Sequence, residues 1–320
     1  MKKTPRISIA PMMDWTDRHY RYFMRLITRH TLLYTEMINA NAITLGDAAR
    51  FLKYDASEHP LAIQLGGSEP HALTLSAKMA EDAGFDEVNL NVGCPSDRVQ
   101  AGRFGACLMA EPTLVAECVA SMKESVNVPV TVKTRIGIDK QENYEFLYQF
   151  IETVANAGCE TFIIHARKAW LNGLSPKENR TVPPLRYDIV RQVKQDFPTL
   201  KICINGGITD PRSVINEFDD LDGVMIGREA YHNPYSFATV DADVFGAKTT
   251  PMTRKDIIEN YLPYIKMELA NGTRLSQMTR HILGLFQGVP GARAWRRYLS
   301  EHSNKQNAGV NVIRDALMEF

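Results

Sequence analysis

One cysteine stands where it could act as an acid. Cys94 directly follows the short run Glu87–Val92, in the sequence Gly-Cys-Pro. Most lone cysteines are small apolar fillers, and this description fits Cys107, Cys118, Cys159 and Cys203. Cys94 fits it poorly, because a glycine and a proline flank it at a loop mouth. A thiol with a reference pKa of about 8.5 is mostly protonated at neutral pH, so Cys94 is predicted to donate a proton.

A lysine interrupts a run of residues that should be buried. Lys133 follows the apolar run Val128–Val132. An unpaired buried ammonium is costly, so Lys133 needs an anion. It could stabilise negative charge on a reduced flavin ring, or form a Schiff base with a carbonyl substrate. A lysine whose ammonium group reaches the solvent at the rim is the structural alternative.

Glycines follow two later runs and indicate a phosphate site. Asn205-Gly206-Gly207 ends one run, and Gly227-Arg228 ends the next. Glycines allow backbone N–H groups to approach phosphate oxygens, and an arginine adds charge-assisted hydrogen bonds. Tight turns alone would also use these glycines. No GxGxxG motif follows any run, so a mononucleotide such as FMN fits better than a dinucleotide.

These residues lie within a repeated unit that predicts a (β/α)8 barrel. Each unit is a short apolar run, a polar loop and a helical pattern. The runs are Arg6–Pro11, Leu32–Met37, Leu61–Gly66, Glu87–Val92, Pro129–Arg135, Thr161–Ala166, Lys201–Asn205 and Gly223–Gly227. The intervening helices are predicted at Thr16–Arg29, His71–Ala83, Pro112–Glu124, Tyr144–Ala157, Tyr187–Asp196 and Pro211–Phe218. Eight such units predict an α/β TIM barrel over residues 1–241.

The barrel places the chemistry-bearing residues at one end. Active sites of such barrels lie at the C-terminal ends of the strands. Pro11, Met12, Met13, Gln64, Asn91 and His165 are also expected there, beside Cys94, Lys133 and the glycine loops. The loop Arg167–Pro184 is predicted to be ordered over the barrel mouth. Its part from Arg167 to Arg180 carries a charge of +3, which includes Lys177.

A small all-helical domain is predicted to follow the barrel. Residues 242–253 are a polar linker, and residues 254–320 show only helical patterns, broken near Asn271-Gly272 and at Gly288–Gly291. Leu269–Ser300 contains five arginines and no acidic residue. Arg293, Arg296 and Arg297 would share one side of a helix over Ala292–Ser300, anchored by Trp295 and Leu299. Such a face makes an anionic polymer a plausible partner, whereas a solvated charged face is the plain alternative.

Composition excludes several classes. Lys+Arg and Asp+Glu are both 37, so the neutral chain is no histone-like coat. Hydrophobic residues make up 44% of the 320, which excludes wholesale disorder. No apolar run approaches the ~18 residues of a membrane span. Five cysteines without CxxC favour a reducing cytoplasm over a disulfide framework or a zinc site. We therefore expect a cytoplasmic protein without bound metal, and nothing indicates an obligate protein partner.

The motifs resemble those of the tRNA-dihydrouridine synthases over essentially the whole chain. NVGCPSDRV together with VKTRIG is highly specific to that family, and IAPMMDWTDRHYRYFMR, TEM, QLGG and INGGI agree with it. SPKENR, GVMIGREA and GLFQGVPGARAWRRYLS look most like the A-type branch. The resemblance implies an FMN-containing TIM barrel and a C-terminal helical domain that binds tRNA. It further implies NADPH-dependent reduction of uridine to 5,6-dihydrouridine in the D-loop, around U20 and U20a.

The resemblance also implies roles for individual residues. Pro11, Met12 and Met13 would pack on the flavin, Gln64 would hydrogen-bond its ring, and Lys133 and His165 would contact it. Its phosphate would be held by Asn205, Gly206, Gly207, Gly227 and Arg228. Hydride would pass from the flavin to uracil C6, and Cys94 would protonate C5. Asn91 would hold the flipped base through its paired donor and acceptor. Lys177, Arg180, Arg293, Arg296 and Arg297 are expected to contact tRNA.

Three rival functions remain from the residues themselves. A flavin barrel acting on a free pyrimidine explains the site but gives the acid-free arginine segment no role. A lyase that forms a Schiff base through Lys133 would carry no flavin. A non-catalytic RNA chaperone would have no need of Cys94, Lys133 and His165 on one rim. A flavin spectrum separates the last two from the others.

Overall fold

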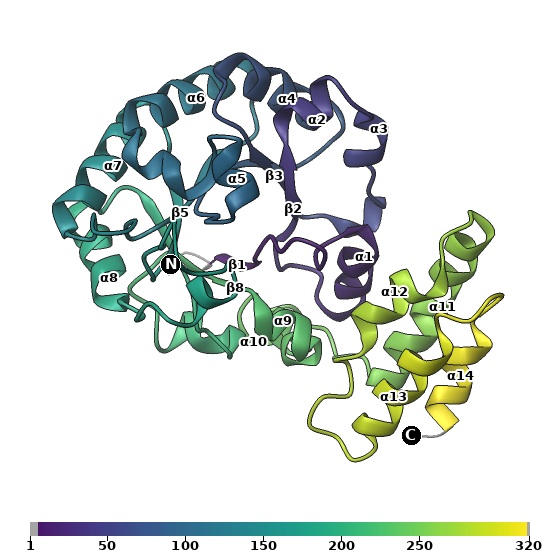
Figure 1. Ribbon diagram of the computed structural model, residues 1–320. Coiled ribbons are helices and arrows are strands. Elements are labelled where there is room, and N and C mark those ends of the chain that lie inside the picture. The colour runs from purple at the N-terminus through teal and green to yellow at the C-terminus, as the bar shows by residue number, and fades with distance from the viewer. Residues whose placement is uncertain (1–5, 319–320) are drawn as a thin grey trace.

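Eight parallel strands form the centre of the computed structural model, which describes residues 6–318. The strands are β1 (Arg6–Ile9), β2 (Leu33–Asn39), β3 (Leu61–Gly66), β4 (Glu87–Val92), β5 (Val130–Arg135), β6 (Thr161–His165), β7 (Lys201–Asn205) and β8 (Gly223–Ile226). Their order in the sheet is β1-β8-β7-β6-β5-β4-β3-β2. A parallel bridge between Ser8 and Leu32 brings β1 beside the start of β2. The sheet therefore curls into a TIM-barrel-like ring (Figure 1).

The strands confirm the prediction because they carry the signature of sheets covered on both faces. Every residue of β3 and β4 is buried, without the alternation of a half-exposed strand. The ends of the predicted strands differ from those observed by at most two residues. The main outer helices are α1 (Arg18–Ile27), α4 (Pro70–Asp82), α6 (Pro112–Ser125), α7 (Tyr144–Asn156) and α8 (Tyr187–Asp196).

One predicted helix is wrong, and several short ones were not predicted. The segment Pro211–Phe218 contains only the 3-10 helix η4 (Pro211–Ile215), capped by the side chain of Asp210. The adjacent β-branched Val214 and Ile215 favour a helix poorly. The remaining short elements of the barrel are α2 (Ala40–Thr44), α3 (Ala48–Phe51), η1 (Ala56–Glu58), α5 (Asp97–Ala101), η2 (Gly105–Ala110), η3 (Glu178–Arg180), α9 (Arg228–His232), η5 (Pro234–Phe237) and α10 (Val240–Asp243).

Four helices follow the barrel, and the first two of them pack against α1. They are α11 (Arg254–Ala270), α12 (Leu275–Ile282), α13 (Ala292–His302) and α14 (Asn311–Met318), and they gather on one side of the ring (Figure 1). Both predicted breaks fall between these helices. Trp295 and Leu299 are buried, as expected of anchors. The buried apolar side chains of these helices are continuous with those of the barrel.

Two connecting segments matter for the site. The stretch 242–253 begins inside α10 and has no helix or strand from 246 onward. The loop after β6 is ordered by Asn179, which is fully buried and bonds the backbone of Trp170 in both directions. No helix within residues 6–318 has the length and apolar character of a membrane span.

Candidate active site

A large cavity opens at the C-terminal ends of the strands. Its volume of about 1470 Å³ exceeds the ~300–1,000 Å³ of an ordinary ligand pocket, so it can hold two ligands side by side. Most of the residues predicted from the sequence line it: Pro11, Met12, Met13, Gln64, Asn91, Cys94, Lys133, His165, Arg180, Asn205, Gly206, Gly207, Gly227 and Arg228. Lys177, Arg293, Arg296 and Arg297 do not.

Cys94 lies on a tightly held loop after β4. Its backbone N–H donates to Asn91 Oδ1 at 3.0 Å, and its carbonyl accepts from Ala106 N at 2.9 Å. Gly105 has a left-handed φ of 79°, and a Cβ there would lie 2.5 Å from the carbonyl oxygen of Cys94. Only glycine therefore fits against this loop. The thiol is half-buried and lies 3.6 Å from Ser96 Oγ, so it reaches the cavity from a fixed backbone.

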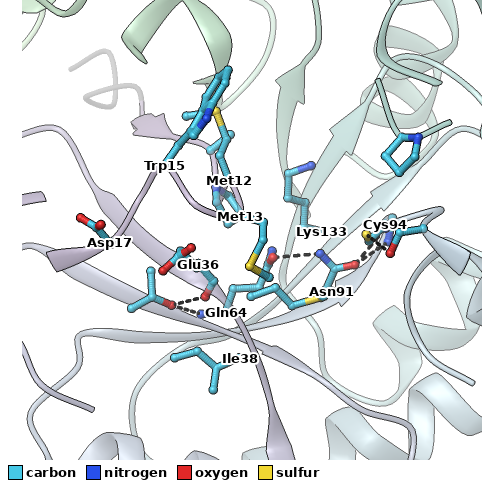
Figure 2. Close-up of a pocket in the computed structure, with 18 of the residues that line it drawn as sticks. Met12, Met13, Trp15, Asp17, Glu36, Ile38, Gln64, Asn91, Cys94 and Lys133 are labelled. Atoms are coloured by element: carbon cyan, nitrogen blue, oxygen red, sulfur yellow. Dashed lines mark hydrogen bonds between the residues drawn. The ribbon is translucent and has the colours of Figure 1, made fainter. Parts of the chain in front are cut away.

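Asn91 uses its oxygen within the protein (Figure 2). Asn91 Oδ1 accepts hydrogen bonds from Gly93 N at 3.1 Å and from Cys94 N at 3.0 Å. Its Nδ2 donates to Gln64 Oε1 at 2.8 Å. Two lone pairs and one hydrogen are thus engaged, and one N–H remains. The expected pairing of Asn91 with a base through both donor and acceptor is therefore reduced to a donor alone.

Two half-buried bases on neighbouring strands are held in unusual protonation states. Burial lowers the pKa of Lys133 to about 7, and the nearby Arg135 guanidinium acts in the same direction. Burial also lowers the pKa of His165 well below its ordinary value, reinforced by Arg135 and Lys133. The imidazole is therefore neutral at physiological pH, whereas Lys133 is poised to take up a proton when an anion approaches.

Arg135 ties the Cys94 loop to the loop after β6. Its side chain is only 3% exposed. Nε donates to the Gly93 carbonyl at 2.8 Å, and Nη1 donates to the carbonyls of Lys168 and Asn179, both at 3.0 Å. Burial lowers its pKa to about 10. Arg135 thus brings a positive charge to the floor of the cavity while it fixes two of its loops.

The glycine loops form a cradle beside this positive charge. Gly206 and Gly207 have left-handed φ values of 115° and 72°, and a Cβ on Gly206 would lie 2.7 Å from His165 Cδ2. Asn205 Nδ2 donates to Met225 O at 2.7 Å, which fixes the start of the loop. Arg228, at the start of α9, also lines the cavity. Close backbone access and cationic side chains fit the phosphate of a mononucleotide.

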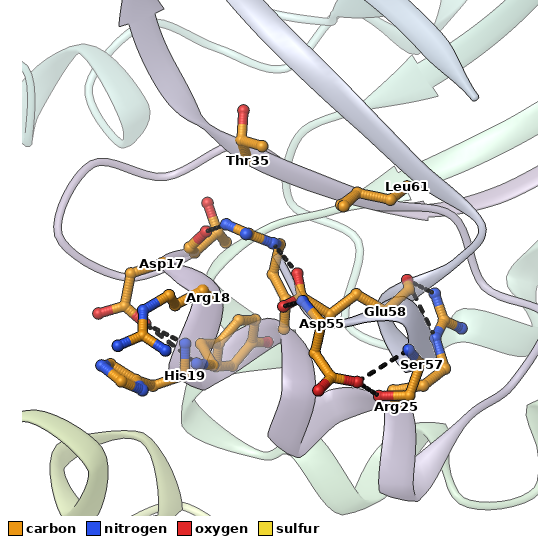
Figure 3. A network of polar contacts seen from close by, with 12 residues as sticks. Asp17, Arg18, His19, Arg25, Thr35, Asp55, Ser57, Glu58 and Leu61 are labelled. Carbon is orange, nitrogen blue, oxygen red and sulfur yellow. Dashed lines mark hydrogen bonds and ion pairs between the residues drawn. The ribbon is translucent and has the colours of Figure 1, made fainter. Parts of the chain in front are cut away.

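The first turns of helix α1 also line the cavity, and this helix is firmly fixed (Figure 3). Asp17 caps it by accepting from the backbone of His19 and Tyr20 at 2.9 and 3.0 Å. Arg25 donates to the Glu58 carbonyl at 2.7 Å, and the Glu58 side chain pairs with Arg21 at 2.6 Å. The residues just before α1 that line the cavity therefore have a rigid support.

Three lining residues were not singled out from the sequence. Trp15 stacks on Tyr231 of α9, with ring centroids 4.3 Å apart. Glu36 accepts from Asp14 N at 2.5 Å, and burial raises the pKa of its carboxyl group. Arg280 of α12 also lines the cavity. The only sequence signal for the first two was their position at or beside strand ends, which many structural residues share.

Most of the expected RNA-binding residues lie away from the cavity. Arg293 and Arg297 are exposed on α13, and Arg296 donates to Gln287 Oε1 at 2.8 Å. Lys177 and Arg180 are exposed on the loop after β6, and of these two only Arg180 also lines the cavity. Arg280 belongs to the same acid-free segment as the three α13 arginines but is neutralised by Asp17, at 2.5 Å. Part of the positive charge of that segment is therefore compensated by an ion pair within the protein.

The sequence matches the model of a known protein family. The model described as "Dihydrouridine synthase (Dus)" matches residues 8–320. The chain therefore belongs to the dihydrouridine synthase family, as the motifs predicted.

Individual relatives agree with this assignment. The chain is 62% identical over 307 residues to the tRNA-dihydrouridine(20/20a) synthase of Shewanella oneidensis, covering 96% of this chain and 91% of the relative. It is 59% identical over 321 residues to the protein of the same name from Vibrio cholerae, covering 100% and 98%. The corresponding Escherichia coli K12 protein is 58% identical over 313 residues, with coverage of 98% and 90%.

A solved structure supports the fold alone. Morphinone reductase superposes with a TM-score of 0.54 at 13% identity, covering 80% of this chain and 93% of that one. The shared architecture confirms the TIM-barrel-like arrangement of the predicted strands.

Proposed function

We propose that this protein reduces uridine to 5,6-dihydrouridine in the D-loop of tRNA, around U20 and U20a, with FMN as cofactor and NADPH as reductant. Family membership and full-length relatives of that name support the reaction. The observation that carries it is the placement of one thiol, one half-buried lysine and a glycine cradle in a single cavity.

FMN suits the residues present, because the cradle accepts a single phosphate and the cavity leaves room beside it. The phosphate would be held by Asn205, Gly206, Gly207, Gly227 and Arg228. Lys133 would face the end of the ring that becomes negative on reduction. Met12, Met13 and Pro11 would pack on the ring, with Gln64 and His165 at its edge. When bound, reduced FMN supplies the hydride for uracil C6.

Cys94 would donate the proton to uracil C5. Its backbone is fixed by Asn91 and Ala106, so the thiol needs no reorganisation to reach a base in the cavity. Asn91 would offer its remaining N–H to a carbonyl oxygen of that base.

Substrate binding would extend beyond the cavity. Residues 254–320 would serve as the helical tRNA-binding domain, with Arg293, Arg296 and Arg297 on phosphates. Lys177 and Arg180 would contact the tRNA from the loop after β6. The barrel, residues 1–241, would hold the flipped uridine.

The experiment begins with the purified protein. Heat release of the chromophore and chromatography should give FMN, and NADPH with tRNA that lacks dihydrouridine should give dihydrouridine in nucleoside digests. FAD, or no flavin, would contradict the cofactor assignment. Turnover of free uridine but not of tRNA would favour the free-pyrimidine alternative.

One specific observation favours a second chemistry. A lysine with a pKa of about 7 is also a competent nucleophile for a Schiff base. Borohydride trapping with carbonyl compounds tests this directly, and a colourless protein that is trapped at Lys133 would replace the flavin proposal.

A further inference from the structure

The barrel interior contains a continuous chain of polar side chains where barrels normally pack bulky apolar ones. Gln64 on β3, Asn89 on β4 and Thr131 on β5 lie at one level, as register partners. Asn91 lies one layer nearer the cavity, and Glu87 lies one layer nearer the other end. All five side chains are at most 8% exposed, so their polar groups must find hydrogen-bond partners inside the barrel.

Each link of this chain is a short hydrogen bond. Asn91 Nδ2 donates to Gln64 Oε1, Gln64 Nε2 donates to Asn89 Oδ1, and Asn89 Nδ2 donates to Thr131 Oγ1, each at 2.8 Å. Thr131 Oγ1 donates to Glu87 Oε1 at 2.7 Å. The chain thus runs without interruption from Asn91 to a carboxylate in the opposite half of the barrel.

The groups at the two ends of this chain allow its hydrogen bonds to run in only one direction. At the cavity end, Gly93 and Cys94 present backbone N–H groups, which can only donate to Asn91 Oδ1. At the far end, Glu87 is paired with Arg6 at 2.6 Å and can only accept. If the three amides were reversed, donor would face donor at Gly93 and Cys94, and Thr131 could no longer donate to Glu87. Only one orientation of Asn91, Gln64 and Asn89 satisfies both ends.

We propose that Thr131 and Asn89 are positioning residues for the Cys94 loop. The Glu87 carboxylate can only accept, so it fixes the orientation of Thr131 and Asn89, and these in turn fix the amide orientations of Gln64 and Asn91. Gln64 is the middle amide, and within the protein its direction is set by Asn91 and Asn89. If Gln64 turned over, its NH₂ group would face the NH₂ group of Asn91. The grip of Asn91 on Gly93 and Cys94 would then loosen. The kinetic part of this proposal rests on the proposed function, whereas the loop geometry does not.

The variant Thr131→Val removes the hydroxyl at nearly constant volume, and Thr131→Ser retains it. Thr134→Val is the matched control, because Thr134 is also fully buried on β5 but bonds only the carbonyls of Val92 and Arg135, at 3.3 and 3.4 Å. Hydrogen–deuterium exchange of the purified holoprotein, read by mass spectrometry, reports on the backbone amides of Gly93 and Cys94. In Thr131→Val these amides should exchange about tenfold faster, the effect of weakening roughly one buried hydrogen bond.

The same variants separate positioning from general stability. We expect kcat for tRNA reduction to fall about tenfold in Thr131→Val with KM for tRNA unchanged, and to recover in Thr131→Ser. Thr131→Ala serves if Thr131→Val does not fold. Exchange in Thr131→Val equal to that in Thr134→Val would overturn the proposal, and so would a serine variant as defective as the valine variant. A wild-type protein that forms no dihydrouridine would contradict the proposed function, while the exchange data still decide the role of the chain.

Discussion

Arg18 donates to both carboxylate oxygens of Glu268, although the two residues are 250 positions apart, with Nη1 lying 2.6 Å from Oε1. The pair joins the first turn of α1, beside the cavity, to the helix α11. Its neighbours strengthen the junction, since Tyr261 OH donates to the His19 carbonyl at 3.0 Å. The barrel wall and the C-terminal helices therefore share a polar seam as well as an apolar core.

Glu268→Gln should lower the free energy of unfolding by about 1–2 kcal/mol at pH 7, because Glu268 is buried while Arg18 keeps partial solvent contact. Arg18 lowers the pKa of Glu268 to about 2. The folded pKa is below the unfolded value, so this stability is present above about pH 4.5 and lost as pH falls toward 2. Urea unfolding between pH 3 and pH 7 measures the effect. Asp82→Asn, which breaks the exposed ion pair with Lys78, is the control and should cost under ~0.5 kcal/mol. Equal losses in the two variants would contradict a structural role for the seam.

Cys94→Ala should retain its flavin and its reduction by NADPH, while dihydrouridine formation falls by about 10²–10⁴-fold. In the proposed mechanism the thiol takes part only in proton transfer, after the cofactor has been reduced. Stopped-flow flavin absorbance and nucleoside analysis measure the two steps separately. Cys107→Ala, which removes a half-buried thiol outside the cavity lining, is the control. A normal rate of dihydrouridine formation in Cys94→Ala would exclude this residue as the acid.

Lys133→Met should stabilise the flavin-free protein most strongly at low pH. Between about pH 7, the lowered pKa of Lys133, and the ordinary lysine pKa, the folded state binds fewer protons than the unfolded chain. The stability of the wild type therefore rises with pH through this window, relative to the variant. The difference in the free energy of unfolding between the two proteins should shrink by about 2–3 kcal/mol from pH 6 to pH 9. Denaturant titrations measure it, with Lys201→Met, at an exposed lysine, as control. If the free energy of unfolding of Lys133→Met and of the wild type changed equally with pH, the pKa of Lys133 would not be lowered in the folded protein.

Reversal of Arg293, Arg296 and Arg297 to glutamate should weaken tRNA binding. The salt dependence of binding should flatten by about one unit for each phosphate that these side chains no longer neutralise. Flavin content should not change, because these residues lie outside the cavity lining. Affinity across a salt series measures the effect. As a control for a single charge reversal, Arg297→Glu is compared with Lys201→Glu. Lys201 begins β7 and therefore lies at the end of the barrel away from the cavity. Unaltered affinity and slope would make the loop with Lys177 and Arg180 the leading docking site.

The barrel was predictable because buried parallel strands leave short apolar runs that recur with helical patterns between them. The cavity position of Cys94 was predictable because it directly follows a strand, between Gly93 and Pro95. That of Lys133 was predictable because it interrupts an apolar run. The hydrogen bond between Asn91 and Gln64 was not, since the register between β3 and β4 is absent from the sequence. The neutralisation of Arg280 was also hidden, because its partner Asp17 is 263 positions away.

The seam between α1 and the C-terminal helices limits how these helices could be exchanged among relatives. Tyr22 of α1 stacks on Tyr264 of α11 with centroids 3.9 Å apart, and Asp17 binds His281 of α12 at 3.0 Å. A graft of residues 254–320 alone would separate each of these groups from its partner and leave buried charges uncompensated. A chimera that exchanges these helices would have to carry the start of α1 together with them. In protein engineering, the practical cut therefore passes through the barrel wall and not through the segment before α11.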